Sequence, residues 1–395
     1  MRKTDVIRYR YESFGGIVHL KHPPALVWVD RDFMRSLGYA DSPLWDAPAS
    51  YLSAPTEVHL SLTNRCSAGC PGCYTDSYAA GSRQEEAAGE IGYEGHRRII
   101  EELAAARVFH VAMGGGESME LPWLFDIAAD ARRLGLVPNL TTNGYLVTPE
   151  SARQCRVFGQ INVSIDGVGD RYQAVRGVDG FARADRALTL LRRARCSFGI
   201  NTVVSRLNFD DLEDIVRYAR KKRAGQIEFL RFKPAGRGIA TFTEMDLTPA
   251  QAADFYPRIV ALQKKYRVNL RLDCSFMPML FAHRPDRERA ERFTVAGCYG
   301  GDMLVGVRPD GAVNACSFAP VEAWPADELR SWWDKPEAFR LFRTWADNAP
   351  EPCRSCDYLD LCRGGCHAVA LAVHGTMDAP DPGCPIVRAE QGRDD

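Results

Sequence analysis

Residues 57–74 read EVHLSLTNRCSAGCPGCY, an alternating apolar stretch that runs directly into a loop with three cysteines. The alternation over 57–63 predicts a β-strand with one buried face. The loop places Cys66, Cys70 and Cys73 in the spacing Cys-x3-Cys-x2-Cys. In folds built from βα units, functional groups gather on the loops that follow the strands. The stretch therefore predicts the first strand of a sheet and a metal-binding loop at its end.

Beyond this strand the chain alternates between strand and helix patterns. Repeated βα units predict a parallel sheet with right-handed crossovers. Six units curl toward a barrel without completing eight strands, so we expect an α/β fold, a partial (β/α)6 TIM-like barrel. The strand patterns are 57–63, 109–115, 137–143, 160–166, 198–204 and 226–232, and the main helical patterns are 93–108, 121–135, 181–195 and 212–223.

The barrel, which we expect over residues 51–240, is flanked by two further regions and a linker. Residues 1–50 form a small element in which 17–20 and 25–30 read as strands and Asp30 caps a helix. Such an element can capture a peptide as an added strand, or it can simply close the open barrel. We expect a linker with one long helix over 241–297 and a cysteine-rich domain over 298–395.

Composition narrows the classes of partner and compartment. The 395-residue chain carries 50 basic and 51 acidic residues, so its net charge of −1 gives no reason to expect nucleic acid or a membrane surface as partner. No signal peptide and no apolar run of about 18 residues is present, and we expect a cytoplasmic protein. Disulfides are rare in that compartment, so the 13 cysteines indicate metal binding.

Three thiolates on one loop differ from the usual structural zinc site, which has four ligands. A [4Fe–4S] cubane has four irons, so three thiolates leave one iron open for a substrate or cosubstrate. From the loop alone, zinc and a plain electron-transfer cluster remain alternatives.

The loop after the first barrel strand resembles that of the radical S-adenosylmethionine (radical SAM) superfamily. In that family the open iron chelates the amino and carboxylate groups of SAM, and reductive cleavage gives a 5′-deoxyadenosyl radical that takes hydrogen from the substrate. By resemblance Gly115, Gly116 and Glu117 bind the SAM ammonium side, and Asn143 lies near the cosubstrate. Ser164 and Asp166 lie near the ribose or carboxylate, and Arg176 pairs with the carboxylate.

Two positions depart from the family pattern. Gly72 stands where an aromatic residue often packs on the adenine, and Ser118 follows Glu117 where proline is usual. The first departure leaves the adenine-packing group unassigned, and neither affects the cluster thiols.

The seven cysteines after residue 297 are spaced like those of the SPASM domain, which holds two auxiliary [4Fe–4S] clusters. The resemblance therefore implies three [4Fe–4S] clusters and SAM as cofactors. The fourth ligand of the first auxiliary cluster is Cys274, another side chain, substrate or solvent. A structural role in folding, without a redox role, remains an alternative for all seven of these cysteines. By resemblance the first auxiliary cluster takes Cys298, Cys316 and Cys366, and the second takes Cys353, Cys356, Cys362 and Cys384.

Many relatives with this domain modify peptides. The resemblance implies a radical SAM oxidoreductase that crosslinks or oxidises a ribosomally synthesised peptide, with a flavodoxin or ferredoxin-type electron donor. The alternatives are a dehydrogenase or epimerase of a small molecule, such as a sugar or cofactor precursor, and a non-catalytic multi-cluster electron-transfer protein. The acid–base group is unassigned. Ser317 follows Cys316 where sulfatase-maturing enzymes often have aspartate, and His59 on the first strand can face the barrel interior.

Overall fold

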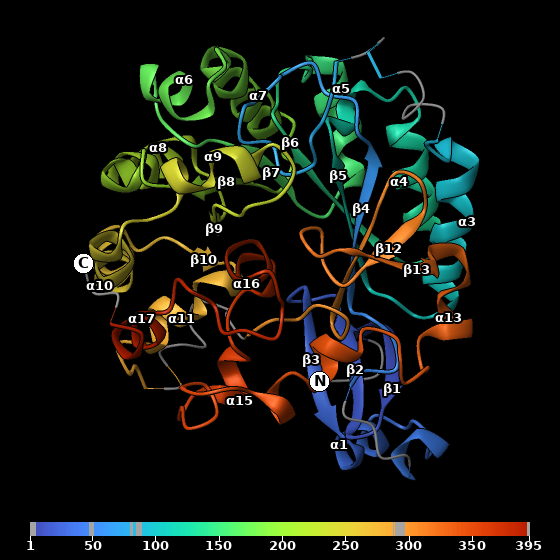
Figure 1. The fold of residues 1–395 in the computed structure, drawn as a ribbon. Helices are drawn as coiled ribbons and strands as arrows, with labels where there is room; N and C mark the ends of the chain where they lie inside the picture. The colour runs from blue at the N-terminus through green and yellow to red at the C-terminus, as the bar shows by residue number, and fades with distance from the viewer. Residues whose placement is uncertain are drawn as a thin grey trace.

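The computed structural model describes residues 5–46, 51–79, 82–83, 89–286, 288 and 297–392. Its centre is a sheet whose strand order is β10-β9-β8-β7-β6-β5-β4-β11-β12-β13, with the strands from β4 to β10 parallel (Figure 1). All six predicted barrel strands are present and follow one another in sequence order. They are β4 (Glu57–Thr63), β5 (His110–Gly115), β6 (Val137–Thr142), β7 (Ile161–Ser164), β8 (Phe198–Val204) and β9 (Ile227–Arg231).

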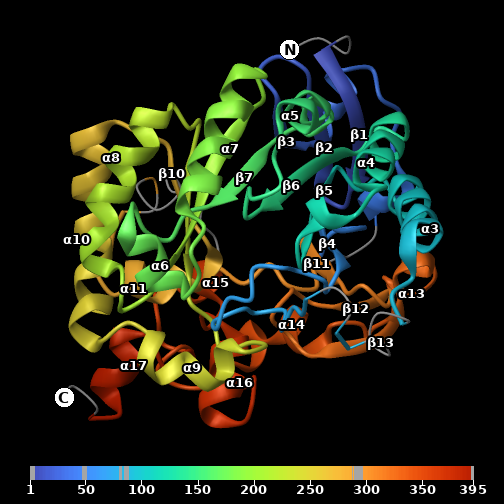
Figure 2. The ribbon, with the colours of Figure 1, turned by 90° about the horizontal axis from the view of Figure 1, so that it is seen from above.

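Helices cover the outer face of these strands, as the βα pattern predicts. Figure 2 shows them as an arc around the sheet, with the C-terminal elements on the opposite side. Their apolar stripes explain the packing, since residues such as Ile99, Ile127 and Ile215 are fully buried against the strands. The arc consists of α3 (Gly92–Ala105), α4 (Leu124–Arg133), α5 (Pro149–Gln154), α7 (Phe181–Arg193), α8 (Leu212–Lys222) and α10 (Pro249–Tyr266), while α6 (Asp170–Arg176) and α9 (Gly238–Met245) follow β7 and β9.

The sheet is wider than the six strands predicted. β10 (Leu270–Leu272) adds a parallel strand beside β9, and β11 (Leu304–Val307) pairs in parallel with β4 at the other side. β12 (Ala312–Asn314) and β13 (Val321–Pro325) then continue antiparallel. The cysteine-rich region predicted over 298–395 therefore contributes strands to the barrel sheet itself, and the domain boundaries at 240 and 297 stay predictions.

Side chains alternate in exposure along the barrel strands. In β4, Val58 and Leu60 point to the helices and are 0% and 1% exposed. The side chains of Glu57 and His59 point inward and are 38% and 41% exposed. These two side chains lie on the face of β4 opposite the helices and are accessible to water there. We call the space that this face borders the lumen; the polar residues that face it are Glu57, His59, His110, Asn139, Asn162, Glu228 and Arg271.

The N-terminal element is an antiparallel sheet of β1 (Val6–Glu12), β2 (Gly15–Leu20) and β3 (Ala25–Asp30), followed by α1 (Arg31–Ser36) and the turn η2 (Pro43–Asp46). The predicted cap is present, since Asp30 accepts from the Phe33 amide at 2.7 Å. β1 was not predicted, and the predicted end of the element falls on residues 47–50, outside the described residues.

This sheet packs on the amino ends of the barrel strands. Arg107 donates to the Tyr9 carbonyl at 3.0 Å, just before β5 begins. Arg10, 4% exposed, pairs with Glu12 at 2.6 Å and donates to the carbonyls of Pro55 and Ala54 at 2.9 and 2.6 Å. A buried ion pair with all its donors satisfied therefore holds the element to the start of β4.

Apart from the strands β11 to β13, the C-terminal region consists of short helices joined by loops. One fully buried ion pair connects it to the barrel, since Arg231 at the end of β9 lies 2.7 Å from Asp381. None of the helices among the described residues combines the length and apolar character that a membrane span requires. The short helices are α11 (Met277–Phe281), α13 (Leu329–Trp332), α14 (Arg340–Thr344), α15 (Leu359–Cys362), α16 (His367–His374) and α17 (Pro385–Glu390).

Replacing Arg10 tests the attachment of the N-terminal sheet. Arg10→Met leaves the Glu12 carboxylate buried without its cation, so we expect the free energy of unfolding to fall by about 3 kcal/mol. Thermal unfolding measures the loss, and limited proteolysis locates it in residues 5–46. The control is Arg35→Met, which removes the exposed pairs with Asp32 and Asp41 and should change neither readout. Equal effects of the two variants would contradict the assignment.

Candidate active site and cysteine sites

The three-cysteine loop leaves β4 at its carboxyl end and is held on several sides. The Cys66 amide donates to the Tyr78 carbonyl at 2.7 Å, and the Asn64 amide donates to Glu90 at 2.8 Å. Arg237, from the start of α9, donates to the Cys70 carbonyl at 3.0 and 3.1 Å. The loop is thus fixed by backbone contacts that leave its thiols free to bind a metal.

The thiols of this loop lie in surroundings of different polarity. Burial raises the pKa of the Cys66 thiol to about 11. Burial also acts on Cys73, but hydrogen bonds from Thr75 and Ser77 outweigh it and lower the pKa of that thiol. Hydrogen bonds favour a thiolate, and an iron ion would favour all three. Three half-buried thiols on one loop therefore fit an iron–sulfur cluster.

Two of the predicted cosubstrate residues lie beside these thiols. Arg176 Nη2 is 3.6 Å from Cys70 Sγ, and Asn143 Nδ2 is 4.0 Å from Cys66 Sγ. Arg176 also pairs with Asp166 at 2.7 Å, and the other Asp166 oxygen accepts from the Val203 amide at 2.7 Å. The structure thus brings the ends of β6 and β7 to the loop, while the contacts of these residues with SAM stay predictions.

The Gly115-Gly116-Glu117 motif brings the end of β5 against the loop. A Cβ on Gly116 would lie 2.1 Å from the Arg65 carbonyl oxygen, so only glycine fits there. The Glu117 carboxylate is 1% exposed and accepts from Met119 N, Thr142 Oγ1 and Asn143 N at 3.1, 2.7 and 2.8 Å. Burial raises the pKa of Glu117. In this structure Glu117 therefore organises the turns after β5 and β6, and its predicted contact with the SAM ammonium remains untested.

The remaining predicted positions lie around the same end of the barrel. Ser164 is half-buried on the inward face of β7. A Cβ on Gly72 would lie 3.0 Å from the Phe232 ring, so Phe232 fills the space beside the position where relatives carry an aromatic residue. Tyr74 instead turns to Phe318, with ring centroids 5.0 Å apart.

A second group of thiols forms where the C-terminal region meets the barrel. Burial raises the pKa of the Cys298 thiol to about 12 and that of Cys366 to about 11, and neighbouring thiolates add to both shifts. Burial, and then the charge of Cys298, raises the pKa of Cys274 well above its usual value. The charges of Cys298 and Cys366 act on Cys274, and those of Cys316 and Cys366 act on Cys298, so these four thiols lie near one another; the ligand set itself stays a prediction.

A third group lies in a pocket of its own. The pocket contains Cys353, Cys356, Cys362 and Cys384, the four thiols predicted for the second auxiliary cluster. Burial and the charges of the other thiols raise the pKa of Cys353 to about 12 and of Cys384 to about 11. A cationic cluster core bound here would favour the thiolate forms of these four side chains, so the donor set fits such a cluster. Its apolar walls come from Pro278, Phe281, Pro352, Leu359, Ile386 and Val387.

The spacing of these thiols bears on the choice of metal. Among the described residues, no three His, Cys, Asp or Glu side chains stand close enough to hold a single ion. Four sulfurs around one zinc ion would lie about 4 Å apart, whereas a cubane places each thiolate on a separate iron. The kind of metal centre in each of the three groups stays a prediction.

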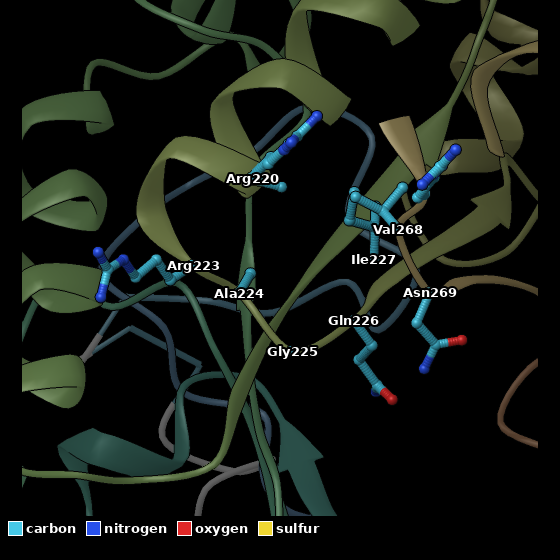
Figure 3. A pocket seen from close by; sticks show the side chains of 10 residues that line it. Arg220, Arg223, Ala224, Gly225, Gln226, Ile227, Val268 and Asn269 are labelled. Atoms are coloured by element: carbon cyan, nitrogen blue, oxygen red, sulfur yellow. The ribbon is translucent and has the colours of Figure 1, made fainter. Parts of the chain in front are cut away.

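Another surface pocket lies away from the three groups of thiols, and its lining residues do not converge on one point. It encloses about 310 Å³ at the amino end of β9, next to the end of α8. Figure 3 shows that the guanidinium groups of Arg220 and Arg223 point away from each other. The basic run at residues 217–225 thus ends a helix at the surface, as expected for a solvated terminus.

Sequence reasoning missed one set of lumen contacts. His59 Nε2 lies 3.4 Å from Glu57 Oε1, and His59 Nδ1 lies 3.4 Å from Ser317 Oγ. The alternation of β4 placed His59 inside the barrel, but nothing in the sequence linked it to Ser317, 258 positions away.

The glycines of the β5 loop provide a matched test of the cysteine loop. Gly116→Ala forces a methyl group against the Arg65 carbonyl, so we expect the loop to shift and the iron bound after anaerobic reconstitution to fall by about a third. Gly114→Ala is the control, because a Cβ there meets no atom within 4 Å. Iron analysis and thermal unfolding measure both variants. Full iron content in Gly116→Ala would show that the loop tolerates the displacement.

Comparison with known proteins agrees with the geometry. The sequence profile of the Radical SAM superfamily matches residues 60–219. A PqqA peptide cyclase of Ruegeria pomeroyi is 29% identical over 86% of this chain and 89% of its own length. An AdoMet-dependent heme synthase of Methanosarcina barkeri is 29% identical over 84% and 97%. The mycofactocin maturase MftC of Mycolicibacterium smegmatis is 31% identical over 84% and 83%.

The same fold occurs in a solved structure. Streptococcus suis SuiB, bound to its precursor peptide SuiA, superposes with a TM-score of 0.73 over 95% of this chain and 98% of its own, at 15% identity. The three-thiol loop follows the carboxyl end of β4, and the glycines after β5 pack against it. Together with the sequence relatives above, this shows that the chain belongs to the radical SAM superfamily and is an enzyme that uses a [4Fe–4S] cluster and SAM.

Proposed function

We propose that the chain is a peptide-modifying radical SAM oxidoreductase that crosslinks or oxidises a ribosomally synthesised peptide. The observation that carries the proposal is that the inward-facing polar side chains of the barrel reach from β4, which ends in the Cys66 loop, to Ser317 beside Cys316. A substrate in the lumen would reach both the Cys66 loop and Cys316. The named activity of the PqqA peptide cyclase supports a peptide as substrate.

The cluster of the Cys66 loop, when bound with SAM, supplies a 5′-deoxyadenosyl radical that abstracts hydrogen from the substrate. The residues around this cluster site hold the cysteine loop in place and orient the groups that would bind SAM. Gly115 and Gly116 let the backbone after β5 approach the loop closely, and Glu117 fixes the Asn143 amide. Arg176, held by Asp166, directs a guanidinium at the cluster end of the lumen, where a carboxylate would be bound.

The two further thiol groups are proposed as auxiliary [4Fe–4S] sites. Cys353, Cys356, Cys362 and Cys384 share one pocket. For the other site, the charges of Cys298 and Cys366 raise the pKa of the Cys274 thiol. This proximity supports Cys274 as the fourth ligand. Cluster potentials span a wide range and respond to charge and hydrogen bonding, so such a site can accept an electron from the substrate. A flavodoxin or ferredoxin-type protein is the proposed electron donor to the enzyme.

The N-terminal element offers a place for peptide recognition. Within the described residues β3 pairs only with β2, so its other edge has free backbone groups. Trp28 on β3 and Phe33 on α1 are 43% and 37% exposed beside that edge. An extended peptide could add to β3 and cover these side chains.

A small molecule is the second candidate substrate. The AdoMet-dependent heme synthase is as similar to this chain as the peptide cyclase is. Addition of peptides or porphyrins to the same turnover assay separates the two candidates.

The first test of the proposal is SAM cleavage. Anaerobically reconstituted protein with SAM and dithionite should form 5′-deoxyadenosine, and Cys73→Ala should reduce its rate by about 100-fold or more because the cluster loses a ligand. Cys196→Ala removes a thiol outside the three groups and serves as control. Liquid chromatography measures the product. No 5′-deoxyadenosine from the wild-type protein would refute the radical mechanism.

The second test concerns Cys274. Cys274→Ala should change the electron paramagnetic resonance spectrum of the first auxiliary cluster, because one iron changes its ligand. The matched control is Cys155→Ala, which removes a buried thiol remote from all three groups. A spectrum of Cys274→Ala identical to that of wild type would exclude Cys274 as a ligand.

A further inference from the structure

We propose that His59 is the proton acceptor for oxidation of the substrate radical, held in place by Glu57 and reached through the hydroxyl of Ser317. The inference rests on the proposed function, since it assigns a base to that oxidation. It stands on three side chains that meet in the lumen next to Cys316.

The His59 ring lies between the other two side chains. Glu57 Oε1 and Ser317 Oγ lie 3.4 Å from opposite nitrogens of the His59 ring, Nε2 and Nδ1. If the Nε2 proton points to the carboxylate, Nδ1 is the free base and faces the hydroxyl. A carboxylate behind an imidazole holds its tautomer and stabilises the imidazolium that forms on proton uptake.

The surroundings keep Glu57 ionised for that role. Burial alone would raise the pKa of Glu57, but the hydrogen bond and charge of His59, with His110 and Arg271, lower it to about 2. His59 remains 41% exposed to the lumen, so a substrate can approach it. The groups that face His59 or Glu57 are His110 on β5, Glu228 on β9, Arg271 on β10 and Ser317 after β12.

The position of Ser317 links the base to the electron acceptor. Ser317 follows Cys316, one of the thiols proposed to hold the first auxiliary cluster. A proton and an electron can therefore leave the substrate at neighbouring places. A histidine that only lined the lumen would not need a carboxylate and a hydroxyl as partners beside that thiol group.

The proposed oxidation of the substrate has two steps. The substrate would first lose one hydrogen atom from a C–H bond to the radical that bound SAM supplies. It would then give a proton from an adjacent N–H, O–H or C–H group to His59, through Ser317, and an electron to an oxidised iron–sulfur cluster that Cys274, Cys298, Cys316 and Cys366 would hold. The substrate has lost two hydrogen atoms and gained one bond, as a double bond or a crosslink.

The turnover test uses a pool of synthetic peptides of about 20 residues, long enough to span from β3 to the Cys66 loop, with SAM and dithionite. Mass spectrometry measures peptides lighter by two hydrogen atoms, relative to the 5′-deoxyadenosine formed. We expect this ratio to fall about 100-fold or more in His59→Gln, as for loss of a general base. His374→Gln, on α16 outside the lumen, is the matched control and should keep the wild-type ratio.

Rescue distinguishes a base from a structural role. Added imidazole should restore part of the ratio to His59→Ala, and His59→Gln with Ser317→Asp should recover it because a carboxylate then stands beside the substrate. A His59→Gln ratio equal to that of wild type overturns the inference. Absence of oxidised peptide with wild-type enzyme refutes the peptide oxidation instead.

A substrate-free measurement keeps the inference testable in that case. Diethyl pyrocarbonate should modify His59 from the lumen in the reconstituted enzyme, whereas His96, which is 0% exposed, should not react. Peptide mapping by mass spectrometry reads both sites. An unreactive His59 would overturn the inference, because no substrate proton could reach it.

Discussion

The crowding of buried thiols is the constraint on which the rest of the structure depends. Folding brings Cys384 to the segment that carries Cys353, Cys356 and Cys362, in one pocket with apolar walls, where burial and neighbouring charges raise the pKa values of Cys353 and Cys384. At these pKa values the thiols stay protonated near neutral pH, and a cationic cluster core that binds them would favour their thiolate forms. The helices around it have four to eight residues, so they bury little surface of their own. Assembly of the clusters and folding of this region should therefore be linked.

Buried charge connects this region to the barrel. Arg231 and Asp381 are both almost fully buried and lie 2.7 Å apart, and Asp381 also accepts from the Cys366 amide at 2.9 Å. Nearby, Lys233 pairs with Asp273, the residue before Cys274. The two pairs fix the end of β9 against the thiol group at Cys298 and Cys316. The lumen consequently has one wall from the barrel and one from the cysteine-rich region.

The strength of the local signal separates what the sequence predicted from what it missed. β4 to β9 have clear apolar alternation between amphipathic helices, and each was predicted within one or two residues. β10 and β12 have three residues each, and β11 pairs with β4 across about 250 positions, so no local pattern reveals them. The thiols were predicted from spacing. Glu117 could not be seen to serve the turns after β5 and β6, since its partners Thr142 and Asn143 lie on another strand.

The positions of the two ends of the barrel limit the form of the substrate. The N-terminal sheet contacts residues 54–55 and 104–107, which precede β4 and β5, whereas the Cys66 loop follows β4. The seven residues of β4 separate these ends by about 23 Å. A peptide held on the edge of β3 and modified near Cys66 must cross that length, and an extended chain covers about 3.3 Å per residue. At least seven residues would then lie between the recognised segment and the modified residue. A small substrate needs no such spacing, so its dependence on the N-terminal sheet would differ from that of a peptide.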